Sequence, residues 1–499
     1  MRTYTISLIP LSKDITVREG TRLLDVLHEY GIEFPCGGQG RCGKCGVRLL
    51  QGTIRADRHH MELIRSLGHS DEWRLSCLSS CTSDLVLEVA QFETIIQADE
   101  TPFKFNPGRG LGIAFDLGTT TLVGQLLDLE SGQILAVEKA MNPQRKLGAD
   151  LVTRLENALD SGRDEATVLI RKRVEEMVDR LMTGRGNAFE RMVMVGNTVM
   201  HHFFSDLDIA PLSFYPFHSP HLKMVQFAPE ELGWKEAWSG SIHFYPPIGS
   251  FVGSDILAGI LATGMHRKKE YSVLIDLGTN GEIVAGNRDG LLCASTAAGP
   301  AFEGAAISCG MQATQGAIAS VEPAGDSWRC KVIGDTAPAG ICGSGLMDAV
   351  AVMLEHRLLG EFGEILSGKN EVVISGDVKL TQKDIQEFQL AKSAITTGLH
   401  ILLRRLSISL DEVDQLYISG GFGSYINPEN LRKTGMINLT AERIARLGNT
   451  ALIGAKMFLF EPAGAADSLR SLTTHVNLES EPDFQELFIK NLSFDVQAE

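Results

Sequence analysis

Four cysteines in the first part of the chain have a spacing that suits an iron–sulfur cluster. Cys36, Cys42 and Cys45 form a C-x5-C-x2-C pattern, and Cys77 follows about thirty residues later. Four thiolates from a tight loop and a distant strand suit one [2Fe–2S] cluster, which is a one-electron redox centre. The glycines of the loop permit positive φ angles and bring backbone N–H groups near the sulfurs, which lowers the energetic cost of the negative charge on a cluster.

Two other interpretations of these cysteines remain open. A structural zinc site also uses C-x2-C pairs, but the five-residue gap and the glycines fit zinc badly. Cys81 is an alternative fourth ligand to Cys77, although we expect it to be a free, half-buried thiol. Five of the nine cysteines lie between Cys36 and Cys81, and in a reducing compartment such clustering indicates metal binding or catalysis.

With this loop, residues 1–95 resemble the ferredoxin family. The gap of five residues between Cys36 and Cys42 resembles that of adrenodoxin-like members, whereas plant ferredoxins have a gap of four. The resemblance implies a β-grasp domain that holds a [2Fe–2S] cluster. It implies that the cluster ligands are Cys36, Cys42, Cys45 and Cys77.

Two loops with the sequence Asp-Leu-Gly-Thr are candidate phosphate-binding sites. The stretch 112–121 is echoed by the stretch 273–282, and each copy predicts a strand, a tight loop and a second strand. The N–H groups and threonine hydroxyls of such loops can bind phosphate oxygens, while the aspartate can organise Mg²⁺ or a water molecule. Two such loops that face each other across a cleft between duplicated lobes predict a phosphate clamp.

A third glycine-rich stretch, 418–425, follows a short apolar strand, and its glycines permit close approach to a base and ribose. The alternative is that all three stretches are turns of an unrelated α/β protein. Together they resemble the superfamily of acetate and sugar kinases, Hsp70 and actin, in which ATP sits between two lobes. The matching residues are Asp116, Gly118, Thr119 and Thr120 in the first phosphate motif, Asp276, Gly278, Thr279 and Asn280 in the second, and Gly420, Gly421 and Gly423 in the adenosine motif.

Four further stretches, 195–202, 251–255, 298–304 and 340–345, resemble the ferredoxin-fused reductive activators of corrinoid proteins. Longer members of that family carry an extra segment between ferredoxin and nucleotide lobes, where this chain has only a short linker. The resemblance adds Asn197 to the expected nucleotide-binding residues. Asp255 and Glu303 either complete a Mg²⁺ shell or cap backbone turns. For His201 and His202 we expect a structural or phosphate-proximal role, because adjacent helical side chains point apart.

The activity implied by this resemblance is ATP-dependent reductive activation of a corrinoid protein. An electron from the [2Fe–2S] cluster would return Co(II) to Co(I), with ATP and Mg²⁺ bound between the lobes. The implied partners are the corrinoid protein of a methyltransferase system and an external low-potential electron donor, and a homodimer is possible. The alternatives are a redox-sensing ATP-binding regulatory protein, an electron activator of another low-potential metalloenzyme, and a small-molecule kinase.

The elements around these motifs predict a multidomain α+β and α/β protein of 499 residues. We expect a β-grasp ferredoxin domain over residues 1–92, a linker over 93–110, and a duplicated two-lobe actin-like ATPase over 111–271 and 272–499. Helical patterns cover residues 21–32, 167–182 and 346–359, and a final helix is expected over 449–460.

Composition and charge exclude several classes of partner. The formal net charge of −16 disfavours nucleic acid, since the chain would repel phosphate backbones. The longest apolar runs fall short of the ~20 residues needed to span a bilayer, so we expect no membrane partner. The first residues lack a basic stretch followed by an apolar core, which predicts a cytoplasmic protein.

Overall fold

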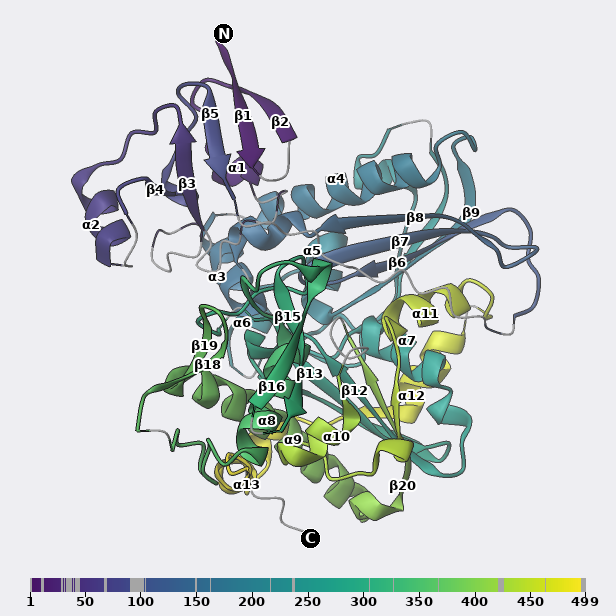
Figure 1. Cartoon of the computed structure of the whole chain (residues 1–499). Coiled ribbons are helices and arrows are strands. Elements are labelled where there is room, and N and C mark those ends of the chain that lie inside the picture. The colour runs from purple at the N-terminus through teal and green to yellow at the C-terminus, as the bar shows by residue number, and fades with distance from the viewer. Residues whose placement is uncertain are drawn as a thin grey trace.

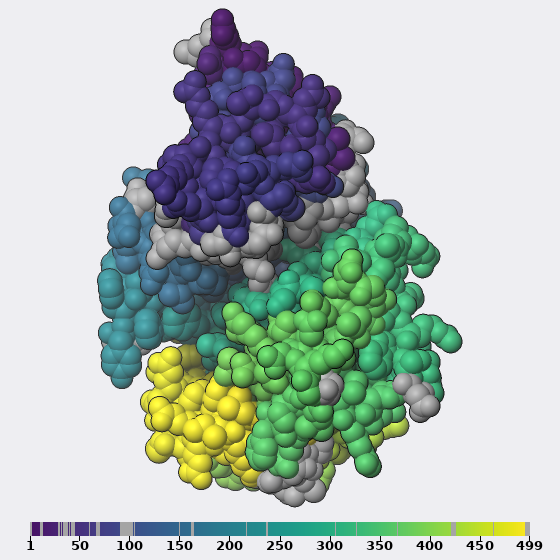
Figure 2. Space-filling model, turned by 60° about the vertical axis from the view of Figure 1, so that its left-hand side comes forward, coloured from purple at the N-terminus to yellow at the C-terminus, as the bar shows by residue number. Residues whose placement is uncertain are grey.

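The computed structural model of the chain describes residues 2–9, 13–27, 30, 32, 38, 40, 45–66, 70–89, 103, 105–148, 150–161, 163–215, 217–235, 238–304, 306–325, 327–366, 368–420, 426–462 and 464–494. Figure 1 shows a small N-terminal domain at the upper left, the first α/β lobe with α4 to its right, and the second α/β lobe below. In Figure 2 this domain, in purple, stands over both the first lobe (teal) and the second lobe (green). Among the described helices, none has the length and apolar composition that a bilayer crossing requires.

The N-terminal domain is a five-stranded sheet with the order β2-β1-β5-β3-β4. Its elements are β1 (Thr3–Ile9), β2 (Lys13–Arg18), α1 (Leu24–Leu27), β3 (Gly46–Gln51), α2 (Arg58–Ser66), β4 (Trp73–Leu75), the 3₁₀ turn η2 (Ser76–Leu78) and β5 (Leu85–Glu88). The alternation in β1 buries Ile6 and Leu8 in the core of this domain. Helix α1 lies within the predicted stretch 21–32, of which residues 28, 29 and 31 lie outside the described residues.

The first lobe is built on a six-stranded sheet with the order β10-β11-β9-β6-β7-β8. Its elements are β6 (Leu111–Leu117), β7 (Thr121–Asp128), β8 (Ile134–Met141), the 3₁₀ helix η3 (Pro143–Leu147), α3 (Leu151–Ser161), α4 (Arg163–Leu181), β9 (Ala188–Gly196), α5 (Thr198–Ser205), α6 (Ala210–Ser213), β10 (Val225–Phe227), η4 (Pro229–Leu232) and β11 (Ser239–Phe244). Helix α4 confirms the helix predicted over 167–182 and begins four residues earlier.

The second lobe repeats this plan on a sheet with the order β21-β20-β12-β13-β14-β22. Its strands are β12 (Tyr271–Leu277), β13 (Gly281–Asn287), β14 (Gly290–Thr296), β20 (Val413–Ser419), β21 (Ile444–Arg446) and β22 (Thr473–His475). Two smaller sheets contain β15 (Ala317–Ala324), β16 (Ser327–Val332) and β17 (Gly340–Ile341), and β18 (Glu371–Ser375) and β19 (Val378–Thr381). In both lobes an antiparallel hairpin, β6–β7 or β12–β13, is extended by a third antiparallel strand and flanked by a parallel one, so the predicted duplication is confirmed.

The helices of the second lobe bury a large apolar core against its sheet. They are α8 (Gly343–Glu355), α9 (Gln382–Leu406), α10 (Pro428–Lys433), α12 (Ala465–Leu472) and α13 (Phe484–Lys490), with short 3₁₀ turns η5 (Met265–Arg267), η6 (Pro300–Glu303), η7 (Ile333–Asp335), η8 (Leu410–Glu412), η10 (Ala441–Arg443) and η11 (Leu478–Ser480). The helix predicted over 346–359 is α8, which begins three residues earlier and ends four residues earlier.

Two helices, α7 (Ser254–Thr263) and α11 (Thr450–Phe458), lie between the two large sheets (Figure 1). They share one apolar cluster with β6 and β9 of the first lobe and β12 and β13 of the second. Helix α11 matches the helix predicted over 449–460, but the prediction that it is the final helix is wrong, since α12 and α13 follow it. The reason is that short amphipathic turns after residue 460 are stabilised by packing against earlier elements rather than by their own length.

The contact between α7 and α11 requires a glycine. A Cβ added to Gly454 would lie 2.1 Å from the carbonyl oxygen of Ala258, so the two backbones approach more closely than any other residue allows. A Cβ on Gly259 of α7 would meet the Leu274 side chain at 2.8 Å and the Thr450 hydroxyl of α11 at 3.2 Å. The two helices therefore fill the space between the sheets at a separation set by backbone contact.

Replacement of this glycine tests the importance of the helix contact. We expect Gly454→Val to lower the free energy of unfolding by about 2–3 kcal/mol, because the added side chain forces α7 and α11 apart. Urea denaturation of the purified protein measures the change. Gly464→Val is the matched control, since a Cβ at Gly464 meets no atom within 4 Å, and it should change the free energy by less than about 0.5 kcal/mol. Equal stability of the two variants would contradict the prediction.

Candidate functional site

A cavity of about 270 Å³ opens between the lobes where the two hairpin loops face each other. The sequence-predicted residues that line it are Asp116, Gly118, Thr119, Thr120, Asn197, Asp255, Asp276, Gly278, Thr279, Asn280, Glu303 and Gly420. The other two residues of the predicted adenosine motif, Gly421 and Gly423, lie outside the described residues. The fold thus brings together residues that are as much as three hundred positions apart in the chain.

Asparagine side chains hold the first phosphate loop from two sides. Asn197 is the N-cap of α5, where its Oδ1 accepts from the Met200 N–H, and its Nδ2 donates to Thr119 Oγ1 at 2.8 Å. Asn142 donates through Nδ2 to the carbonyl of Gly118 at 2.9 Å and through its backbone N–H to the carbonyl of Thr120 at 2.9 Å. The loop is therefore preorganised, with its remaining N–H groups and hydroxyls available to a ligand.

Side chains of the second lobe hold the second phosphate loop. Thr279 Oγ1 donates to Glu303 Oε2 at 2.8 Å, and Ser419 Oγ donates to Asp276 Oδ2 at 2.6 Å. Gly420 follows that serine with φ +96°, and a Cβ there would lie 2.2 Å from the carbonyl oxygen of Leu277. Only glycine permits this approach, which places the start of the predicted adenosine motif directly against the end of β12.

Four carboxyl groups converge on the floor of the cavity. Burial, together with the charge of Asp276, raises the pKa values of Asp116 and Asp255 to about 7. Burial also raises the pKa of Asp276, and it raises that of Glu282 well above the usual range, together with the charges of Asp255 and Asp276. Asn449, the N-cap of α11, opposes the shift at Asp116 by donating to its Oδ2 at 2.6 Å. Because these carboxyl groups share one cavity, they favour the binding of either protons or a cation there.

The residues present fit a magnesium–nucleotide complex better than a bare metal ion. In the described ranges, no three His, Cys, Asp or Glu side chains form a group that would hold a metal ion without help. Mg²⁺ is normally bound by one or two carboxylates, with the other positions filled by water and substrate phosphates. Asp255 also accepts from the Ile256 N–H at 2.8 Å in the first turn of α7, so both roles predicted for it are compatible with the geometry.

Three residues of this site were missed by sequence reasoning. Glu282 lies in the second motif but corresponds to Leu122 in the first copy, so the repeat offered no signal for it. Asn142 and Asn449 stand before helical segments as N-caps, which is a common role for asparagine and carries no functional signal. Only the contact of their amide groups with Gly118 and Asp116 distinguishes them.

The structure describes two of the four cysteines that we predict to bind the cluster. Cys36 and Cys42 lie outside the described residues. Cys45 and Cys77 are both buried, with their sulfurs 3.2 Å apart, and the hydrogen bond between the two thiols is the main cause that lowers the pKa of the Cys45 thiol to about 7. A thiolate is the form that binds iron, so this pair fits a shared cluster. Gly38 of the same loop has φ +79°, as expected for a loop that turns tightly.

Cys81 has a different environment. Its thiol is fully buried and donates to the carbonyl oxygen of Ser83 at 3.3 Å, and burial raises its pKa. These contacts favour a free structural thiol, more buried than the half-buried thiol expected from the sequence.

The adjacent histidines are core residues of the first lobe. Both rings are buried in α5, and burial lowers the pKa values of His201 and His202 to about 3 and about 4. The Nδ1–H of His202 donates to the carbonyl oxygen of Thr198 at 2.9 Å, and its Nε2 lies 3.2 Å from Ser219 Oγ. Two neutral, buried rings, of which that of His202 is hydrogen-bonded, agree with the structural role expected for them.

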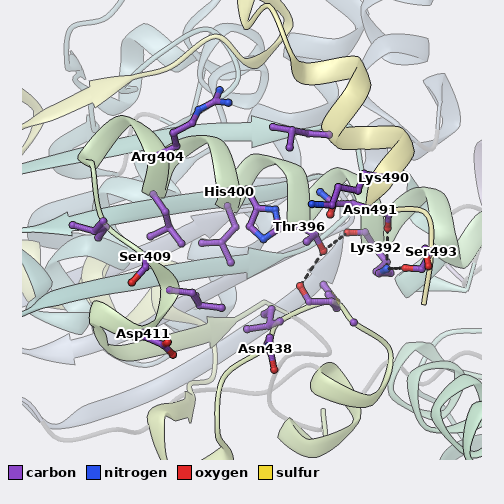
Figure 3. Close-up of a pocket in the computed structure, with 18 of the residues that line it drawn as sticks. Lys392, Thr396, His400, Arg404, Ser409, Asp411, Asn438, Lys490, Asn491 and Ser493 are labelled. Carbon is purple, nitrogen blue, oxygen red and sulfur yellow. Dashed lines mark hydrogen bonds between the residues drawn. The ribbon is translucent and has the colours of Figure 1, made fainter. Parts of the chain in front are cut away.

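A larger pocket of about 660 Å³ lies in the second lobe beside α9 and α13, and neither phosphate loop lines it (Figure 3). Its cations already have protein partners. Lys392 Nζ donates to the carbonyl oxygens of Asn491 and Ser493, and Arg404 pairs with Asp483. The cavity between the lobes, although smaller, is therefore the site at which the predicted functional residues meet.

Three family models match consecutive parts of the chain. The 2Fe-2S iron-sulfur cluster binding domain matches residues 8–82, the RACo middle region matches residues 111–268, and the C-terminal domain of RACo, described as the ASKHA domain, matches residues 270–499. These matches confirm the predicted fold class, a ferredoxin domain followed by a nucleotide fold of the actin and sugar-kinase type. They also confirm the predicted resemblance to ferredoxin-fused reductive activators, because the domains follow one another in the expected order.

Individual proteins agree with the family models. The chain is 29% identical to the corrinoid activation enzyme RamQ of Eubacterium limosum, over 97% of this chain and 98% of the relative. That alignment extends over 584 positions, more than the 499 residues of this chain, so the relative contains segments absent here. The chain is 28% identical to a Co(II) methylated amine-specific corrinoid protein reductase of Methanosarcina barkeri, over 78% and 77% of the two chains.

One solved structure is similar over the whole molecule. It is described as a reductive activator for corrinoid, iron-sulfur protein, and it superposes with a TM-score of 0.67 at 25% identity, covering 98% of both chains. The order of the domains and the two-lobed nucleotide fold are therefore common to both proteins.

The contacts of the two cysteines predict which of them binds the cluster. We expect Cys77→Ala to lose the cluster, because its thiol lies against that of Cys45, whereas Cys81→Ala should retain it. Iron and sulfide analysis and visible absorption of the anaerobically purified variants measure the outcome. Loss of the cluster in Cys81→Ala with retention in Cys77→Ala would assign Cys81 as the ligand instead.

The raised carboxyl pKa values predict how stability depends on pH. Asp116 and Asp255 have an ordinary pKa of 3.8 and values of about 7 in the folded protein. Between these values the folded state binds more protons than the unfolded state, so these groups lower the free energy of unfolding as the pH rises from about 4 to about 7, and not above. Asp116→Asn removes one group and should flatten this decline, as measured by urea denaturation without nucleotide or divalent cation.

A surface aspartate provides the control for this experiment. Hydrogen bonds from Ser131 hold the pKa of Asp128 below its usual range, so this group is ionised in both states across most of the interval. Asp128→Asn should therefore leave the slope between pH 5 and 7 unchanged. An Asp116→Asn protein with the slope of the wild type would show that the carboxyl cluster does not titrate as described.

Proposed function

Because this chain belongs to the RACo family of ferredoxin-fused reductive activators, we propose that it activates a corrinoid protein by ATP-dependent reduction of Co(II) to Co(I). The observation that carries the proposal is the presence, in one chain, of the Cys45–Cys77 pair and of a clamp whose phosphate loops face each other between two lobes. The names of the two relatives and of the similar solved structure support a corrinoid protein as the partner.

The reaction transfers one electron. The cluster, held by Cys45 and Cys77 together with Cys36 and Cys42 in our proposal, supplies the electron that converts Co(II) to Co(I). An external low-potential donor must then return one electron to the protein. A plant-type cluster has a potential near about −400 mV, and each ~100 mV by which the cobalt couple lies lower costs about 2.3 kcal/mol for one electron. The transfer therefore needs a second source of free energy.

ATP bound between the lobes is the proposed source. The residues that would hold its phosphates are the first loop, supported by Asn142 and Asn197, and the second loop, supported by Glu303. Asp116, Asp255 and Asp276 would place Mg²⁺ or a water molecule beside them. Hydrolysis yields ADP and phosphate, and the difference between the lobe positions that each state favours would change the affinity for the corrinoid partner.

Anaerobic visible spectroscopy tests this function. The reduced protein is mixed with a Co(II) corrinoid protein of a methyltransferase system, with and without Mg-ATP. We expect the Co(I) absorption to grow only when Mg-ATP is present. Absence of Co(I) with several corrinoid proteins, despite a reducible cluster, would favour a redox-sensing ATP-binding protein or an activator of another low-potential metalloenzyme.

Replacement of Asp276 tests the clamp within this reaction. Its carboxylate lies at the end of β12, against Ser419. We expect Asp276→Asn to keep its iron and sulfide but to lower the rate of ATP-dependent Co(II) reduction by about 10- to 100-fold, as loss of a residue that orients a metal ion does. Asp467→Asn, an exposed position on α12, is the matched control and should react as the wild type does. Full activity of Asp276→Asn would exclude the clamp from the reaction.

A further inference from the structure

The described residues provide a continuous path from the first phosphate loop to the ferredoxin domain. It passes through a short stretch, residues 142–147, which we name the bridging segment. This segment contains Asn142 and the 3₁₀ helix η3, and it directly follows β8. One end of the segment contacts the phosphate loop, the other end contacts the ferredoxin domain, and its middle is hydrogen-bonded to the first lobe.

One end of the bridging segment is bonded to the phosphate loop. Asn142 uses its side-chain amide and its backbone N–H on the carbonyl oxygens of Gly118 and Thr120, both at 2.9 Å. These carbonyls belong to the same loop whose N–H groups and hydroxyls face the cavity. A ligand that draws the loop toward itself must therefore also displace Asn142 or strain its hydrogen bonds.

The bridging segment itself is firmly embedded. The Oδ1 of Asn142 accepts from the Gln144 N–H at 2.9 Å, and Gln144 Nε2 donates to the carbonyl oxygen of Ala166 at 2.9 Å. The Leu147 carbonyl accepts from Asn157 Nδ2 at 2.6 Å. Closely packed, hydrogen-bonded elements move as units, so a displacement at one end is transmitted along the segment.

The other end of the bridging segment contacts the ferredoxin domain. Lys146 Nζ lies 3.7 Å from Asp25 Oδ1 of α1 and 2.8 Å from Glu165 of α4. The Lys146 side chain is only 12% exposed and that of Asp25 is 43% exposed, so this ion pair is partly shielded from solvent. It joins two folded units that the sequence separates by more than one hundred residues.

The contacted helix lies directly against the cluster loop. Leu24 precedes Asp25 in α1, and a Cβ added to Gly38 would lie 2.5 Å from Leu24 Cδ1 and 3.9 Å from the Cβ of Cys77. Helix α1 therefore touches the cysteine loop and the side of the domain that carries Cys77. Any change in how Lys146 holds α1 alters the position of the cluster ligands relative to the lobes.

A carboxylate bonded to the second phosphate loop also acts on this region through its charge. Arg154 of α3, just beyond the bridging segment, donates through Nε to the carbonyl oxygen of Gly148 at 2.7 Å; burial lowers the pKa of Arg154, and the charge of Glu303 opposes part of that shift. Glu303 in turn accepts from Thr279 of the second loop. The residue that holds the second loop thus interacts electrostatically with an arginine just beyond the bridging segment.

We propose that the bridging segment couples nucleotide binding to the docking of the ferredoxin domain, with Asn142 and Lys146 as positioning residues and Asp25 as the contact point. In this arrangement, binding of Mg-ATP at the first phosphate loop changes the hold of Lys146 on α1 and thereby the presentation of the cluster to its electron acceptor. The proposal rests on the function proposed above only in taking ATP as the ligand of the cavity and the cluster as the electron carrier.

Hydrogen–deuterium exchange of the full-length protein with an intact cluster tests the coupling. Exchange is measured in peptides that cover residues 22–27 and 76–81, with and without saturating Mg-ATP. In the wild type we expect Mg-ATP to change the exchange of α1. Asp25→Asn, which leaves the Lys146–Glu165 pair in place, should reduce this response by about two- to fivefold, the range expected for one partly exposed ion pair. Its ATP hydrolysis should equal that of the wild type.

Further variants exclude a simple structural effect. Asp25→Glu keeps the charge and should retain the response of α1 to Mg-ATP. Lys146→Met should lose this response. The double variant Lys146→Met, Asp25→Asn should respond as Lys146→Met alone does, because both changes remove the same ion pair. Glu88→Gln is the matched control, since Glu88 is about as exposed as Asp25 (47% against 43%) and its ion pair with Arg48 lies within the ferredoxin domain. That variant should respond to Mg-ATP as the wild type does.

The outcomes for the coupling and for the function are distinguishable. A full response in Asp25→Asn, or no response of α1 in a wild-type protein that binds Mg-ATP, would overturn the coupling even if cobalt is reduced. A response that depends on Asp25 in a protein that reduces no corrinoid protein would support the coupling and contradict the proposed acceptor. Loss of ATP-dependent Co(I) formation in Asp25→Asn by the same two- to fivefold factor, with unchanged ATP hydrolysis, would support both.

Discussion

The backbone contact between α7 and α11 is the constraint on which the rest of the structure depends. Gly454 allows the two helices to touch, and the pair fills the space between the sheets of the two lobes. Each helix begins at the cavity, α7 with Asp255 and α11 with its N-cap Asn449 bonded to Asp116. Because protein interiors are closely packed, the separation of these helices determines how far apart the two phosphate loops lie.

Electrostatics explains why such a cavity requires a ligand to complete it. Burial raises the pKa values of Asp116, Asp255, Asp276 and Glu282, and the charges of neighbouring carboxylates add to the shift at all of them except Asp276, so ionisation of the whole group near neutral pH is unfavourable. In the proposed function, a divalent cation that arrives with nucleotide phosphates would stabilise their ionised forms. The same negative charges would then favour a closed, liganded arrangement of the two lobes.

The junction between the ferredoxin domain and the lobes uses modest interactions. Lys146 joins Asp25 on α1 to Glu165 on α4, and a partly exposed pair of this kind contributes at most about 1 kcal/mol. A weak contact suits a domain that must change its position, because a strong one would hold the cluster in a single place. The Lys146–Asp25 pair places the ferredoxin domain directly against η3.

The sequence by itself determined the features that depend on local chemistry. Cysteine spacing predicted the ferredoxin domain, and the repeated Asp-Leu-Gly-Thr loops predicted duplicated lobes with Asp116 and Asp276 at one cavity, because tight loops and thiolate ligands need particular residues at short range. Only the tertiary structure decided the rest. Asn449 acts on Asp116 from 333 positions away, Asn142 bonds the first loop from the far side, and Lys146 meets Asp25, since such contacts depend on how distant elements pack and leave no pattern in the neighbouring sequence.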